Sequence, residues 1–158
     1  MTLDAKLDLS ITRIIKAPVA AVWDAWANPE KFALWWLPAP MRCRVVAMEL
    51  APGGAFETLM AEPGGAWVAH QSACFLAVET GRRIVFSNTL TGGWRPSADP
   101  FLHLTGIFEF RDHPYGTEYV SSALHRTPEE SARHAELGFQ EGWGTVVSQL
   151  AALVERVN

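Results

Sequence analysis

The N-terminal part of the chain alternates strictly between apolar and polar residues before it changes to a helical pattern. Apolar side chains occupy every second position from residue 7 to residue 11, which is the period of a half-buried β-strand. Ala17-Pro18 ends the alternation, and apolar residues then recur at helical spacing over residues 19–26, with Pro18 suited to the first turn. Asn28 can cap a second short helix. The apolar side of that second helix would carry Phe32, Trp35 and Trp36.

Residues 42–125 carry the pattern of an antiparallel sheet, in which short apolar runs alternate with turns rich in Gly, Pro and Asp. The runs predict strands at residues 43–50, 55–60, 67–78, 84–90, 102–110 and 117–124. Because the connecting turns are short, a meander of neighbouring antiparallel strands is favoured over parallel pairing. The longest irregular segment, residues 92–100, is either a lid over a binding site or a solvated surface loop.

The last third of the chain predicts one long amphipathic helix. It starts at Thr127-Pro128-Glu129-Glu130, where Thr127 can cap, Pro128 takes the first helical position and Glu130 completes a capping box. If unbroken to the C-terminus, this helix would be about 45 Å long. Its apolar stripe consists of Trp143, Val147, Leu150 and Val154.

Three glycines lie within this predicted helix, namely Gly138, Gly142 and Gly144. Each should destabilise a helix by about 1 kcal/mol relative to alanine. We expect a compensating reason, which is either close packing against the sheet or room for a bound molecule. Gly138 and Gly142 are one turn apart, so both would leave the same side of the helix bare. We expect that side to look into space for a ligand rather than to touch strand backbone.

The order of elements is a strand, two short helices, a run of strands and a long helix, which predicts an α+β fold. At 158 residues, one domain covering 1–158 is expected. A strongly curved sheet that grips a helix is not always filled by side chains. We therefore expect a cavity between the sheet and the C-terminal helix.

Blocks of residues spread over nearly the whole chain resemble a known family. They are Ala17-Pro18 with Val22-Trp23 and Trp26; Trp35-Trp36 with Pro38; Pro52-Gly53-Gly54-Ala55-Phe56; Ile84-Val85-Phe86; Trp94-Arg95-Pro96 with Pro100-Phe101; and Gly138-Phe139-Gln140-Glu141-Gly142-Trp143. Together they resemble the START-like (SRPBCC) superfamily and, within it, the homologues of the activator of heat-shock protein 90 ATPase. The resemblance implies a helix-grip (START/Bet v-like) fold, in which a curved antiparallel sheet wraps around a long C-terminal helix. It also implies a pocket; Leu37 stands where relatives often have a glycine, which would narrow the flanking loop.

Composition changes this picture little. The chain has 13 basic and 17 acidic residues and no basic run, which argues against nucleic acid and acidic membrane partners. The N-terminus lacks the apolar stretch of a signal peptide, and no segment approaches the ~20 apolar residues of a membrane span, so a cytoplasmic protein is expected.

Cys43 and Cys74 lack CxxC spacing and are expected to be buried thiols. The five histidines lack the spacing of a metal site, and no cofactor is expected.

The chain contains no GxSxG, HExxH, P-loop or GxGxxG motif, so the candidate site is defined by its aromatic residues. Aromatic side chains that could line a pocket, or simply pack in the core, are Trp36, Phe86, Trp94, Phe108, Phe139 and Trp143, with Gly142 beside them. His70 and His125 are candidate polar groups near the cavity, or hydrogen-bonded structural residues. Asn88, His70 and Glu141 could orient a ligand.

Three functions are compatible with this reading. The first is binding of a small hydrophobic ligand between the sheet and the C-terminal helix, for which the candidate residues are Trp36, His70, Phe86, Trp94, Phe108, Phe139, Gly142 and Trp143. The second is an enzyme of polyketide cyclase or hydratase type, with His70, His125 and Glu141 as acid–base groups in the same cavity. The third is a co-chaperone or stress-linked interaction module, which predicts an exposed apolar patch. A homodimer is compatible with each.

Overall fold

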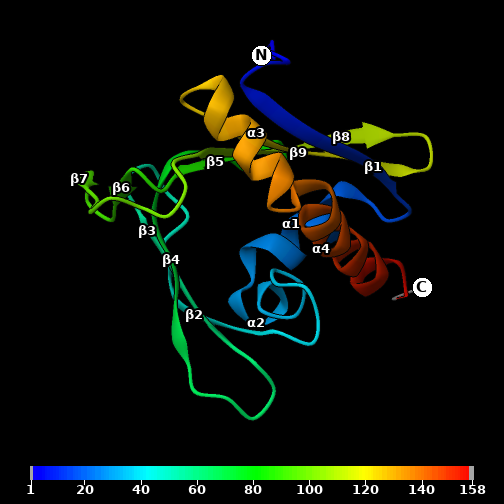
Figure 1. The fold of residues 1–158 in the computed structure, drawn as a ribbon. Helices are drawn as coiled ribbons and strands as arrows, with labels where there is room; N and C mark the ends of the chain where they lie inside the picture. The colour runs from blue at the N-terminus through cyan, green and yellow to red at the C-terminus, as the bar shows by residue number, and fades with distance from the viewer. Residues whose placement is uncertain (1, 157–158) are drawn as a thin grey trace.

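A sharply bent antiparallel sheet of seven strands forms the frame of the protein, as seen in a computed structural model that describes residues 2–156 (Figure 1). Across the sheet, the strands are β1 (Asp8–Ile15), β9 (Gly116–Leu124), β8 (Thr105–His113), β5 (Arg83–Ser87), β4 (Val68–Glu79), β3 (Ala55–Ala61) and β2 (Arg42–Met48). From β2 to β9 the strands follow chain order, and β1 pairs with β9 at the far edge. The predicted α+β fold and its meander are confirmed.

The bend of the sheet coincides with three β-bulges, which lie in β2 and β4 on either side of β3. The strand registers shift at Val46 in β2 and at His70 and Leu76 in β4, each of which is an extra residue opposite a continuous partner strand. A bulge bends its strand and increases the local twist. In Figure 1, β1, β8 and β9 accordingly run across the top of the view while β2, β3 and β4 descend at the left.

Several predicted strand ends differ in the structure, two of them where Asn88 interrupts the ladder. β5 ends at Ser87 rather than at residue 90, and β8 begins at Thr105 rather than at residue 102. The Asn88 side chain donates to the Leu102 carbonyl at 2.5 Å and accepts from the Leu104 amide at 3.0 Å. The segment between them contains a separate two-stranded ribbon of β6 (Leu90–Thr91) and β7 (Arg95–Pro96).

The two short helices after the first strand are α1 (Val19–Ala27) and α2 (Pro29–Phe32). Asn28 caps α2 as predicted, because its side chain accepts a hydrogen bond from the Glu30 amide at 3.0 Å. The second helix is shorter than predicted, so Trp35 and Trp36 lie just beyond α2 rather than on it. The helices contribute to an aromatic core whose buried rings are Trp26, Phe32, Trp35, Phe56, Phe75, Phe86, Phe108, Phe110 and Tyr119.

The C-terminal helix is broken, which corrects the prediction of one continuous helix. Thr127 caps the first piece, α3 (Pro128–Glu136), by accepting from the Glu130 amide at 3.1 Å. The second piece, α4 (Phe139–Glu155), is the long helix that packs on β1 and α1. Between them, Gly138 has a φ of +97°, a left-handed conformation that ends a helix and that glycine adopts without steric cost. The apolar stripe of α4 buries Val147, Leu150 and Val154 against the core.

Candidate ligand-binding cavity

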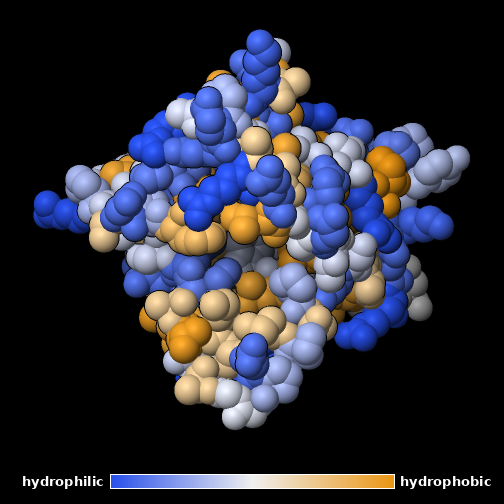
Figure 2. Space-filling model, viewed as in Figure 1, coloured by the Kyte–Doolittle hydropathy of each residue, from blue (hydrophilic) through white to orange (hydrophobic). Residues whose placement is uncertain are grey.

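A cavity of about 260 Å³ lies between the concave face of the sheet and α4. Figure 2 shows a hollow near the middle of the visible face of the molecule, with hydrophobic side chains around much of its rim. The lining residues come from the segment after α2, from β4, β5, β8 and β9, from the connection between β5 and β8, and from α4. They are Trp35, Trp36, Leu37, Pro38, His70, Gln71, Phe86, Asn88, Leu104, Phe108, Tyr119, Ser121, Gly142, Trp143, Val146 and Val147.

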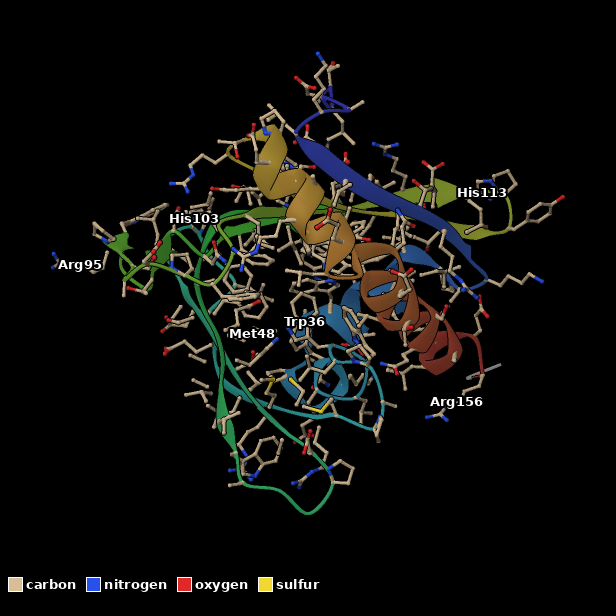
Figure 3. The ribbon with its side chains drawn as sticks, viewed as in Figure 1. Trp36, Met48, Arg95, His103, His113 and Arg156 are labelled. Atoms are coloured by element: carbon tan, nitrogen blue, oxygen red, sulfur yellow. The ribbon has the colours of Figure 1, made fainter. Side chains whose placement is uncertain are left out.

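One wall of the cavity is a continuous chain of aromatic rings. Trp36 meets Phe86 edge to face, with ring centroids 6.4 Å apart. Phe86 stacks on Phe108 at 5.9 Å, and Phe108 stacks on Trp143 at 6.0 Å. In Figure 3, Trp36 lies near the centre of the view, between the strands at the left and α4 at the right. The structure thus brings together the predicted residues Trp36, Phe86, Phe108 and Trp143 from four separate elements.

Two glycines shape this wall in opposite ways. At Gly142, a Cβ atom would meet nothing within 4 Å, so the backbone of α4 faces open space there, as expected from the sequence. At Gly106 in β8, a Cβ atom would lie 2.5 Å from Phe86 Cε1, so only glycine lets the Phe86 ring lie flat on the strand. Gly106 was not among the candidate residues predicted from the sequence. Its signal was an isolated glycine within a strand, which marks a close approach.

Trp94 and Phe139, two further candidate residues, do not line the cavity. Trp94 is 52% exposed, and its indole covers Gly53, where a Cβ atom would lie 2.5 Å from Trp94 Nε1. Figure 3 shows its neighbour Arg95 at the outer end of the β6–β7 ribbon, far from Trp36. Phe139 is 1% exposed and packs behind Trp143, with ring centroids 4.7 Å apart.

The polar part of the wall is concentrated on β4. His70 Nδ1 lies 2.9 Å from the Thr58 hydroxyl, and His70 is the extra residue of a bulge. The bulge lets both His70 and the following residue, Gln71, line the cavity, although consecutive strand residues normally face opposite sides. The His70 side chain remains accessible at the rim, but the surrounding protein displaces enough water to lower the pKa of its imidazole.

The other polar candidates have structural roles or lie elsewhere. His125 is buried, with Nδ1 2.7 Å from the Leu7 carbonyl oxygen and Nε2 2.8 Å from His134 Nδ1. Glu141 is exposed and does not line the cavity. Asn88 lines it, but its amide is used by the Leu102 and Leu104 backbone. The structure therefore does not bring His70, His125 and Glu141 together.

The described residues were also compared with the requirements for a metal site and for a membrane-spanning helix. Within residues 2–156, no three side chains of His, Cys, Asp or Glu are grouped so that they could hold a metal ion. None of the helices in this range is long and apolar enough to cross a membrane.

Comparison with known proteins agrees with this architecture. A protein from Nitrosomonas europaea is 36% identical, with 98% of this chain and 97% of that one aligned and a TM-score of 0.87. A protein from Mycobacterium smegmatis is 26% identical over 94% of this chain and 91% of that one, with a TM-score of 0.77. An AHSA1-like protein from Aeromonas hydrophila, 22% identical over 95% and 93% of the two chains, shares the fold with a TM-score of 0.67. No curated protein matches the sequence significantly.

The match to a family covers most of the chain. The sequence model of the family described as Activator of Hsp90 ATPase homolog 1-like protein matches residues 16–155. This range runs from the end of β1 to the end of α4, so it includes every element that lines the cavity. The chain belongs to this family, within the START-like (SRPBCC) superfamily, as its sequence blocks predicted.

Proposed function

We propose that the protein binds a small, largely apolar aromatic molecule in the cavity between the sheet and α4. The observation that carries this proposal is the continuous wall of Trp36, Phe86, Phe108 and Trp143, together with the open space beside the helix backbone at Gly142. Flat rings favour offset stacking or edge-to-face contacts with other rings, and both geometries are available along this wall.

The size of the cavity limits the ligand. Small-molecule pockets commonly have volumes of about 300–1,000 Å³, and a closed apolar cavity of about 150 Å³ accepts benzene. The volume of about 260 Å³ therefore suits a molecule of one or two rings rather than a sterol or an acyl chain. The hollow in Figure 2 gives such a molecule a route in from solvent.

Binding without turnover accounts for the polar groups better than the cyclase or hydratase alternative. General acid–base catalysis needs titrating groups within hydrogen-bond reach of the substrate. Of the three groups considered, His70 lines the cavity, His125 is held by Leu7 and His134, and Glu141 is exposed elsewhere on α4. A single imidazole that contacts Thr58 fits the role of a ligand contact.

Mass spectrometry of small molecules released from natively purified protein tests the proposal. The variant Gly142→Leu puts a side chain into the open space at the helix, and Gln140→Leu places the same residue on an exposed position of α4 as a control. We expect an aromatic molecule to be released from the wild type and the control, and to be absent from Gly142→Leu. Equal recovery from all three proteins, or no enriched molecule from any, would refute cavity binding.

A further inference from the structure

Two buried N–H groups of residues that line the cavity have no hydrogen-bond partner among the described residues. They are Trp36 Nε1 and Gln71 Nε2. Leaving a buried donor unpaired destabilises a protein by about 1–3 kcal/mol, and native structures pair nearly all such groups.

The neighbouring tryptophans show that this fold pairs its indole groups where the protein supplies an acceptor. Trp26 Nε1 donates to the Tyr119 hydroxyl at 3.0 Å, and Trp35 Nε1 donates to the Ala25 carbonyl at 2.9 Å. Trp36, which follows directly, has no such acceptor although its indole nitrogen is equally shielded from water. Because Trp36 lines the cavity, a molecule bound there can supply the missing acceptor once the side chain shifts enough to uncover its nitrogen.

The charge of the lining restricts what that acceptor is. The described residues that line the cavity include no Lys or Arg, and also no Asp or Glu. A carboxylate or phosphate in this apolar space would lose its hydration without gaining a cationic partner, which is strongly unfavourable. A neutral carbonyl oxygen loses far less hydration and has two lone pairs, so it can accept from an indole N–H and an amide N–H.

We propose that the ligand is a neutral aromatic molecule with a carbonyl oxygen, which accepts hydrogen bonds from Trp36 Nε1 and Gln71 Nε2. This inference rests on the proposed function and specifies the chemistry of its ligand. The bulge at His70 is the device that turns Gln71 toward the ligand, since regular alternation would point only one of the two residues inward. The aromatic rings hold the frame of the molecule, and the two donors fix its orientation.

The matched pair 1-tetralone and tetralin tests the inference, because the two share a bicyclic frame and differ in the carbonyl group. Isothermal titration calorimetry measures both Kd values for the wild type and for Trp36→Phe, Gln71→Leu and Trp143→Phe. We expect Trp36→Phe and Gln71→Leu each to weaken tetralone binding roughly tenfold relative to tetralin. Trp143→Phe should weaken both ligands by the same factor, because it trims the wall without removing an unpaired donor.

The binding data distinguish recognition of the carbonyl group from binding of an aromatic molecule as such. If the wild type binds both molecules and Trp36→Phe and Gln71→Leu weaken them equally, the carbonyl assignment is wrong while aromatic binding stands. If the wild type binds neither, both proposals fail for ligands of this size. Because Trp36 and Gln71 lie on different elements, a folding defect in one variant leaves the other as an independent test.

Discussion

The indole of Trp143 on α4 lies nearly parallel to the ring of Phe108 on β8, with an interplanar angle of 14°. This pair joins the gripped helix to the sheet along the cavity wall. The Trp143 ring also contacts the rings of Phe139 and His134, with centroids 4.7 Å and 5.9 Å away, so one side chain connects α3, α4 and β8. The position of the wall therefore depends strongly on Trp143.

Replacing this ring should affect both stability and binding. We expect Trp143→Ala to lower the free energy of unfolding by about 2 kcal/mol, since the residue is only partly buried, and to abolish aromatic ligand binding. Urea denaturation and calorimetry measure the two effects. Trp94→Ala is the matched control, because Trp94 lies outside the cavity and should leave binding unchanged. An equal loss of binding in both variants would contradict the assigned wall.

The glycines of the C-terminal region should respond to alanine with opposite signs. Gly142→Ala should stabilise the protein by about 0.5–1 kcal/mol, because the position is helical and the added methyl meets open space. Gly138→Ala should destabilise it by about 1–2 kcal/mol, because φ is +97° at that residue. Chemical denaturation of the two variants provides the comparison. Stabilisation by both would mean that the helix runs on through Gly138.

Gly106 should be intolerant of a side chain because of Phe86. A Cβ atom there would lie 2.5 Å from the ring, so we expect Gly106→Ala to destabilise the protein by about 1–3 kcal/mol. Phe86→Leu should relieve part of this loss, so the double variant should be more stable than the sum of the two single effects predicts. Strictly additive free energies of unfolding would show that the two residues do not constrain each other.

The pair His125–His134 should make stability depend on pH. A carbonyl oxygen only accepts, so His125 Nδ1 donates to Leu7, and a single hydrogen lies between His125 Nε2 and His134 Nδ1, because these two facing nitrogens cannot both be protonated. Burial, with a contribution from the charge of His125, lowers the pKa of His134 from 6.5 to about 4. Between these values the unfolded state binds more protons, so stability is complete above pH 6.5 and falls toward pH 4.

The expected loss from His134 between pH 7 and pH 5 is about 1–2 kcal/mol of unfolding free energy. The variant His134→Asn keeps a donor near the Nδ1 position and cannot titrate, so its stability should decline less over this range. Urea denaturation at several pH values measures both proteins. Identical pH profiles for the wild type and the variant would exclude His134 as the responsible group.

The sequence predicts the strands, the caps and most of the aromatic wall, because these follow from periodicity and local side-chain chemistry. It does not reveal the break at Gly138, since a glycine with positive φ and a glycine inside a helix look alike in a pattern. Gln71 was not foreseen for a similar reason, because alternation places it opposite His70 until the bulge is known. Trp94 was misplaced because its contact with Gly53 joins segments far apart in the chain.

Uptake of an aromatic ligand by the cavity beside α4 can be tested directly by NMR. The seven tryptophans provide a direct readout, because each indole N–H gives its own resonance in a ¹H–¹⁵N NMR spectrum. On titration with 1-tetralone, we predict saturable shifts of the Trp36 and Trp143 resonances, with those of Trp67 and Trp94 unchanged. Unchanged Trp36 and Trp143 resonances, or shifts confined to Trp67 and Trp94, would contradict the account.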